Sequence, residues 1–216
     1  MPYSFLEHRL AQENMPKLTK IAKESGITRM NSVYPVVSSV AWTTYSTGEN
    51  PGGHNIFGFV DRVAKPFGIK IPTAKDRKAR TIWSRLSRQG KRVIIINVPM
   101  TYPPERVNGI LVSGFLCPDI EKSSYPVQFC NYLKSQDYTI DVDAWLAQNN
   151  QKKKFMEQLH RAMEKRFTLT FKLFEREEWD FFQLHIMETD RLFHFFWNDC
   201  SVASSWPMSI KSILKK

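Results

Sequence analysis

The stretch Arg92-Val93-Ile94-Ile95-Ile96-Asn97 decides the fold class of this chain. Its four central residues are all β-branched, and an uninterrupted run of this kind is typical of a strand that a sheet buries on both faces. A helical pattern ends at Gly90 just before the stretch, and another helical pattern leads into the apolar segment 179–187. After the stretch the chain is rich in proline, so only short strand-like pieces such as residues 109–115 are expected. Alternation of helices and strands predicts an α/β fold with a mostly parallel central sheet and helices on both faces.

Apolar residues that recur every three or four positions predict three helices. The first helix begins near Asn14 and ends at Gly26, the second spans residues 79–89, and the third spans residues 151–175. Residues 27–33 are predicted to form a strand directly after the first helix. The residues expected to face the core are Leu18, Ile21, Ala22, Ile82, Trp83, Leu86, Phe155, Leu159, Ala162, Met163, Phe167, Phe171 and Phe174.

The composition indicates one globular domain of ordinary size. The chain has 216 residues, of which 42% are apolar and 13% aromatic, enough to bury a core. We expect the domain to span residues 1–199, followed by a basic tail rich in serine and lysine at residues 200–216. No apolar run has the length of a membrane span and no secretory signal opens the chain, so a cytoplasmic protein without membrane contact is expected. Three widely spaced cysteines predict neither a disulfide framework nor a thiolate zinc site.

The net charge of +10 is compatible with an anionic partner. The densest basic stretch, residues 75–92, contains the second predicted helix, whose arginines lie opposite its apolar stripe. That pattern describes a solvated amphipathic helix, and no nucleic-acid-binding signature accompanies it. We therefore expect no nucleic-acid partner, although a non-catalytic basic binding module remains an alternative.

Residues 35–48 predict a helix that opens on a hydroxyl group. Ser38 or Ser39 is expected to be its N-cap, and Gly48 is expected to end it. The free backbone N–H groups and the positive end of the helix dipole would then surround the serine, a favourable place for phosphate oxygens. Two interpretations are open on this segment alone: Ser38 acts on a phosphate, or it only caps the helix.

A carboxylate and an imidazole lie four residues apart directly after the apolar run 181–187. Asp190 and His194 would share one face of a helix that begins where a strand ends. An aspartate oxygen and an imidazole nitrogen at this spacing can bind one Zn²⁺ or Mn²⁺ ion.

With these regions together, the chain resembles the type I phosphodiesterase and nucleotide pyrophosphatase branch of the alkaline phosphatase superfamily. Members carry a proline, a nucleophilic serine or threonine three residues later, a threonine-glycine pair and a proline-glycine-x-histidine turn. The resemblance extends from about residue 3 to residue 197. The matching positions are Pro35, Ser38, Thr47, Gly48, Pro51, Gly52, His54, segments 96–104 and 112–115, and Glu188, Thr189, Asp190 and His194.

The resemblance implies an alkaline-phosphatase-like fold and a centre of two divalent metal ions, usually zinc and alternatively manganese. It implies hydrolysis of a phosphoester or nucleotide through a phosphorylated Ser38, with Ser38, Asp190 and His194 as metal ligands and Ser39 positioning phosphate. A phosphomutase or phosphomonoesterase of the same superfamily is the alternative enzyme. For His54 and His185 we expect packing and hydrogen bonding rather than metal coordination.

The sequence departs from the family pattern at both ends. Members begin with a strand that ends in a metal-binding aspartate, just before the segment that matches residues 2–7 here. They also contribute an aspartate-histidine pair and a further histidine from a second half. Because these ligands are missing from the sequence, we expect an incomplete fold, truncated at both ends, whose isolated activity is weak or absent.

Overall fold

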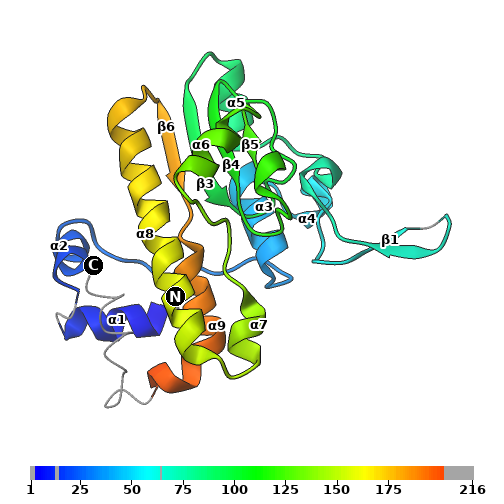
Figure 1. The fold of residues 1–216 in the computed structure, drawn as a ribbon. Coiled ribbons are helices and arrows are strands. Elements are labelled where there is room, and N and C mark those ends of the chain that lie inside the picture. Colours follow the sequence, from blue (N-terminus) through cyan, green and yellow to red (C-terminus); the bar gives the residue numbers. More distant parts are fainter. Residues whose placement is uncertain (1–2, 13–14, 64, 202–216) are drawn as a thin grey trace. The chain divides into compact units, whose positions relative to one another are not determined.

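The computed structural model describes residues 3–12, 15–63 and 65–201 (Figure 1). Their internal contacts divide the chain into two compact units, each of which is described by itself. Unit 1 comprises Met1–Asn31, Asp143–His160 and Glu188–Lys216, and unit 2 comprises Ser32–Val142 and Arg161–Met187.

A four-stranded sheet forms the centre of unit 2, with the strand order β5-β4-β3-β6. Strands β4 and β6 run parallel to β3, and β5 runs antiparallel to β4. Every residue of β3 is buried, as the β-branched run predicts, and β3 lies inside the sheet. The α/β class and the mostly parallel sheet are thus confirmed. The strands are β3 (Val93–Val98), β4 (Gly109–Ser113), β5 (Ser124–Tyr125) and β6 (Phe181–Leu184).

Side chains of β3 alternate between two apolar clusters on opposite faces of the sheet. One cluster includes Leu133 of α6 and Leu169 of α8. The other includes Trp83 of α5, with Trp42 of α3 packed against it. Helices therefore cover both faces. These helices are α3 (Ser38–Thr47), α5 (Ile82–Arg88), α6 (Phe129–Ser135) and α8 (Lys152–Arg176).

The rest of unit 2 consists of short elements that connect the helices to the sheet. Strands β1 and β2 form a separate antiparallel pair, visible in Figure 1 as a hairpin. The elements are α4 (Pro51–His54), β1 (Asp61–Val63), β2 (Gly68–Lys70) and the 3₁₀ helices η1 (Ala74–Asp76) and η2 (Ile120–Lys122).

Unit 1 is helical and packs through aromatic rings. The rings of Phe5 and Phe193 meet edge to face with centroids 5.2 Å apart, and those of Phe155 and Phe195 lie 5.3 Å apart. None of the helices in the described ranges combines the length and the apolar character needed to cross a bilayer. Besides the start of α8, its helices are α1 (Tyr3–Ala11), α2 (Pro16–Ser25), α7 (Ala144–Gln148) and α9 (Met187–Ser201).

Two predictions for the first thirty residues are wrong. Residues 27–33 form no strand, because β-forming residues need a neighbouring strand to pair with and none lies beside this segment among the described residues. Ile21 is 56% exposed rather than buried. Gly26 does end α2, with φ of 74°, whereas the predicted cap Asn14 lies outside the described residues, as does most of the predicted tail.

The buried stripe of α8 follows a different path from the predicted one. Phe155, Leu159, Ala162 and Met163 are buried as expected, but Phe171 and Phe174 are exposed. Beyond Met163 the buried face of α8 includes two polar residues as well as two leucines. These buried residues are Arg166, Leu169, Thr170 and Leu173.

Arg166 is buried because other protein groups replace its water. Its guanidinium donates hydrogen bonds to the Tyr138 hydroxyl and to the carbonyls of Thr139 and Ile140. A charged side chain tolerates burial when its donors are satisfied in this way. In the second predicted helix, α5 begins only at Ile82, which is 43% exposed rather than part of the core.

Candidate catalytic serine and metal-binding pair

Helix α3 is oriented by two contacts with the strand β6 and the residue after it. The ring centroids of Trp42 and His185 lie 4.4 Å apart, and the Tyr45 hydroxyl donates to Oε1 of Gln183 at 2.7 Å. As α3 proceeds along the chain, its partners thus move backwards along β6. Helix α3 therefore begins at the carboxyl edge of the parallel strands, where open α/β sheets bind their ligands.

Ser38 is the first helical residue of α3 and not its cap. The N-cap is Val37, with extended φ and ψ of −124° and 146°, and no side chain caps the helix. The prediction that Ser38 or Ser39 is the N-cap is therefore wrong, and so is the interpretation that Ser38 only caps. Ser38 is half-buried, and its hydroxyl makes no hydrogen bond within the described part of the chain.

The first turn of α3 offers unpaired donors and no negative charge. The first bond of the helix runs from the Ala41 amide to the Val37 carbonyl at 2.9 Å. The amides of Ser38, Ser39 and Val40 therefore lack a carbonyl partner inside the helix, and the first turn contains no acidic residue. Such an end attracts an anion through its N–H groups and its dipole.

Ser39 lies beside the predicted nucleophile but points into the protein. It is 1% exposed, and its hydroxyl has no hydrogen-bond partner among the described residues. Its carbonyl accepts a bond of 2.6 Å from the Thr43 hydroxyl. Nothing in these contacts tests the expected role of Ser39 in positioning phosphate, which stays a prediction.

His54 supports α3 through both of its ring nitrogens. Its Nδ1 accepts the Ile56 amide at 3.1 Å, so Nε2 carries the proton and donates to the Thr44 hydroxyl at 2.9 Å. Burial lowers the pKa of His54, with a smaller opposing effect of a backbone hydrogen bond. These contacts support the expected packing role. His185 is also buried, and its Nδ1 lies 3.1 Å from the Asn97 carbonyl.

Asp190 and His194 lie together on α9 in unit 1. Oδ2 of Asp190 is 3.5 Å from Nε2 of His194, with side chains 41% and 63% exposed. Two donors of a tetrahedral zinc ion, each at about 2.05 Å, lie about 3.4 Å apart. The pair therefore fits two positions of a metal ion. Across the described residues no group of three or more potential ligands is found.

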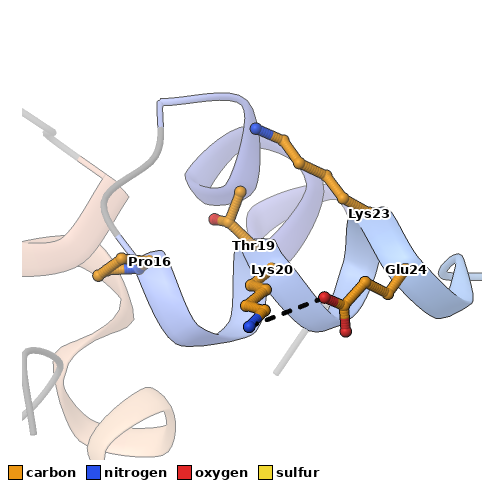
Figure 2. A pocket seen from close by; sticks show the side chains of 5 residues that line it. All are labelled: Pro16, Thr19, Lys20, Lys23 and Glu24. Carbon is orange, nitrogen blue, oxygen red and sulfur yellow. Dashed lines mark ion pairs between the residues drawn. The ribbon is translucent and has the colours of Figure 1, made fainter.

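A separate hollow on α2 is not a candidate active site. Figure 2 shows its lining side chains, Pro16, Thr19, Lys20, Lys23 and Glu24. All five come from one helix, and Lys20 forms an exposed ion pair with Glu24 at 3.9 Å. This wall carries neither a metal-binding pair nor an activated nucleophile.

Asn97 is a residue of interest that the sequence reasoning passed over. It is fully buried at the carboxyl end of β3, its φ is 62°, and both polar atoms of its amide lack partners among the described residues. The pairing of β3 with β4 shifts register at this point. The sequence does contain a signal for this residue, because Asn97 is a polar residue at the end of an apolar strand. Ligands bind at that edge of an open α/β sheet.

Comparison with known families gives a match over most of the chain. The description of the matching family is type I phosphodiesterase / nucleotide pyrophosphatase, and the match covers residues 1–207. No curated protein and no solved structure matches the chain. Because the match covers nearly the whole sequence, the chain belongs to the type I phosphodiesterase/nucleotide pyrophosphatase family.

Proposed function

We propose that this chain is a phosphodiesterase or nucleotide pyrophosphatase that hydrolyses its substrate through a covalent intermediate on Ser38. Membership of a hydrolase family suggests phosphoester hydrolysis. The observation that supports Ser38 most strongly is its place at the start of α3, where its hydroxyl caps nothing. A side chain that is free of a structural task and lies beside unpaired amides is suited to reaction with phosphate.

The first three residues of α3 have defined parts in this reaction. The phosphoryl oxygens bind at the amides of Ser38, Ser39 and Val40. Oγ of Ser38 loses its proton to solvent and attacks phosphorus, and the ester oxygen leaves and is protonated. Water then attacks the same phosphorus atom, which releases the phosphoryl product and restores the serine hydroxyl.

Proteins of this family typically bind two metal ions. In this chain Asp190 and His194 would hold one divalent ion, zinc or alternatively manganese, since their donor atoms are spaced for it. When bound, such an ion supplies positive charge that favours the ionised form of an oxygen that it binds. The expectation that Ser38 is itself a ligand belongs to the same proposal.

A chromogenic phosphodiester tests the proposed reaction directly. In keeping with the expected incomplete fold, we expect weak turnover that requires added Zn²⁺ or Mn²⁺ and that falls by about a thousandfold or more in Ser38→Ala, because removal of a serine nucleophile has effects of this size. The stability of that variant should be unchanged, because Ser38 caps no amide. Ser32→Ala is the control, since Ser32 is exposed and lies outside the helix. Metal-independent turnover, or turnover unchanged in Ser38→Ala, would refute the mechanism.

The alternative enzyme is a phosphomonoesterase or phosphomutase. Both share the serine chemistry and differ in what surrounds the phosphate. The ratio of diester to monoester turnover separates them: a higher rate on the diester supports the phosphodiesterase, and a higher rate on the monoester replaces it.

A further inference from the structure

A second polar hollow lies at the opposite edge of the sheet from Ser38. Its walls are the end of α5 and the segment that enters β4, and its volume is about 590 Å³, in the range of small-molecule sites. The lining includes Ser84, Ser87 and Arg88 from α5, Arg106 from the segment before β4, and Tyr125 of β5. Because β4 begins just after this segment, the hollow lies at the amino ends of the parallel strands.

Hydrogen bonds fix the two walls to each other. The Asn108 amide donates to the Ser87 hydroxyl at 3.0 Å, and the Asn108 side chain donates to the Gly90 carbonyl at 2.9 Å. Beneath the surface, Trp83 of α5 and Val107 belong to the same buried cluster. The positions from which Arg88 and Arg106 extend are therefore set by the fold.

The two arginines of the hollow differ from three other cations of unit 2. Arg77, Lys91 and Arg92 are each paired with a carboxylate. Arg88 and Arg106 are exposed, and neither forms an ion pair within the residues that the structure describes. No acidic residue lines the hollow. The site therefore has two uncompensated positive charges and three hydroxyl groups.

We propose that this hollow binds the phosphoryl group of a small phosphomonoester or of free phosphate. A guanidinium presents paired N–H donors that match phosphate oxygens, and the hydroxyls of Ser84, Ser87 and Tyr125 add further donors. The concave shape favours a compact anion over an extended nucleic acid. The site is separate from Ser38, so it does not depend on the proposed hydrolysis.

Titration of the full-length chain with inorganic phosphate, and separately with AMP, tests this site. The backbone amide resonances of Ser87 and Asn108 are the reporters, since both residues line the hollow and remain in every variant. We expect saturable shifts at both reporters with each ligand. Equal affinities would mean that the site binds only the phosphoryl group, and tighter binding of AMP would mean that it also binds the organic part. Ser38→Ala should leave these shifts unchanged.

Arg88→Gln and Arg106→Gln are each expected to weaken binding by about tenfold or more, the loss of one charge-assisted interaction. Arg85→Gln is the matched control, because Arg85 is an exposed arginine of the same helix that does not line the hollow. Binding that weakens equally in Arg85→Gln would overturn the proposal in favour of a diffuse basic surface. Reporters that respond to a short oligothymidylate but to neither phosphate nor AMP would replace it with nucleic-acid binding, and reporters that respond to none of them would refute it.

Discussion

Helices α3 and α9 both carry residues of the expected chemistry, but the fold holds them in different ways. Ser38 begins a helix whose next two residues, Ser39 and Val40, are buried. The Thr44 hydroxyl of the same helix is hydrogen-bonded to the fully buried His54. Asp190 and His194 lie on a helix surface with side chains 41% and 63% exposed, and they contact each other at 3.5 Å. The proposed nucleophile is thus positioned by the core, whereas the proposed metal-binding pair is positioned by helix geometry alone.

Because of this difference, substitutions near α3 and substitutions on α9 should have different effects on stability and on metal binding. Substitutions behind α3 should destabilise the protein, because buried polar groups lose their partners there. Substitutions of the α9 pair should change metal binding and leave the fold intact. The following variants test whether the two helices differ in this way.

The largest effect is expected at Glu105, which bonds Trp83 in the apolar cluster against which Trp42 of α3 packs. One oxygen of Glu105 accepts bonds from Arg77, Thr81 and Trp83, and the Arg77 side chain is only 6% exposed. Glu105→Ala should lower the free energy of unfolding by about 3 kcal/mol, since it leaves a buried cation unpaired. Urea denaturation measures the loss.

Glu121→Ala is the matched control for this substitution. Glu121 also pairs with a cation, Lys134, but its side chain is 63% exposed. Removal of a solvated pair should leave the urea midpoint nearly unchanged. Equal losses in the two variants would show that the Glu105 network does not stabilise the fold as described.

An intermediate effect is expected on metal binding at α9. Asp190→Asn and His194→Gln should each weaken Zn²⁺ binding by about tenfold or more, because each removes one of two donors. Thermal unfolding without metal should be unchanged, since the two side chains are 41% and 63% exposed. Calorimetric titration measures the affinity.

His8→Gln is the control for the α9 variants, because His8 is an exposed histidine in the same unit. If it weakens Zn²⁺ binding as much as His194→Gln does, the ion binds histidines nonspecifically. Such a result would contradict the proposal that Asp190 and His194 bind the ion as a pair.

The smallest effect concerns the pH dependence of stability at His54. Burial lowers the pKa of His54 in the folded chain below the value of about 6.5 expected when it is unfolded. Its contribution is therefore complete above about pH 6.5 and is lost as the pH falls through the lowered pKa, because the unfolded chain then binds the proton more readily. Urea denaturation of the chain and of His54→Gln between pH 5 and about 8 measures this. A slope that is equal in the two proteins would mean that His54 keeps its ordinary pKa.

Much of the fold could be predicted because its signals are local. The run of residues 93–96 identifies the central strand without knowledge of its neighbours, and Gly26 and Gly48 mark helix ends through their backbone freedom. Residues 27–33 show where local signals fail, since these residues favour a strand but have no neighbouring strand with which to pair among the described residues. Arg166 is another such case, because its burial depends on acceptors about thirty residues away in sequence.

The candidate site likewise has features that the local sequence predicts and features that it does not. The distance between Asp190 and His194 follows from their spacing on one helix, so the sequence predicts it. The cap of α3 does not follow, because adjacent serines have equal capping ability and only the extended backbone of Val37 excludes both. The hollow at Arg88 and Arg106 joins distant segments, which no local pattern reveals.

The most direct test of the account is identification of the covalent intermediate on Ser38. The chain is mixed with a chromogenic phosphodiester and Zn²⁺, quenched in acid, digested and analysed by mass spectrometry. The account predicts that the peptide containing Ser38 carries the phosphoryl group with its remaining ester, and that Ser38→Ala gives neither this adduct nor turnover. Hydrolysis that continues in Ser38→Ala, or an adduct on another residue, would contradict it.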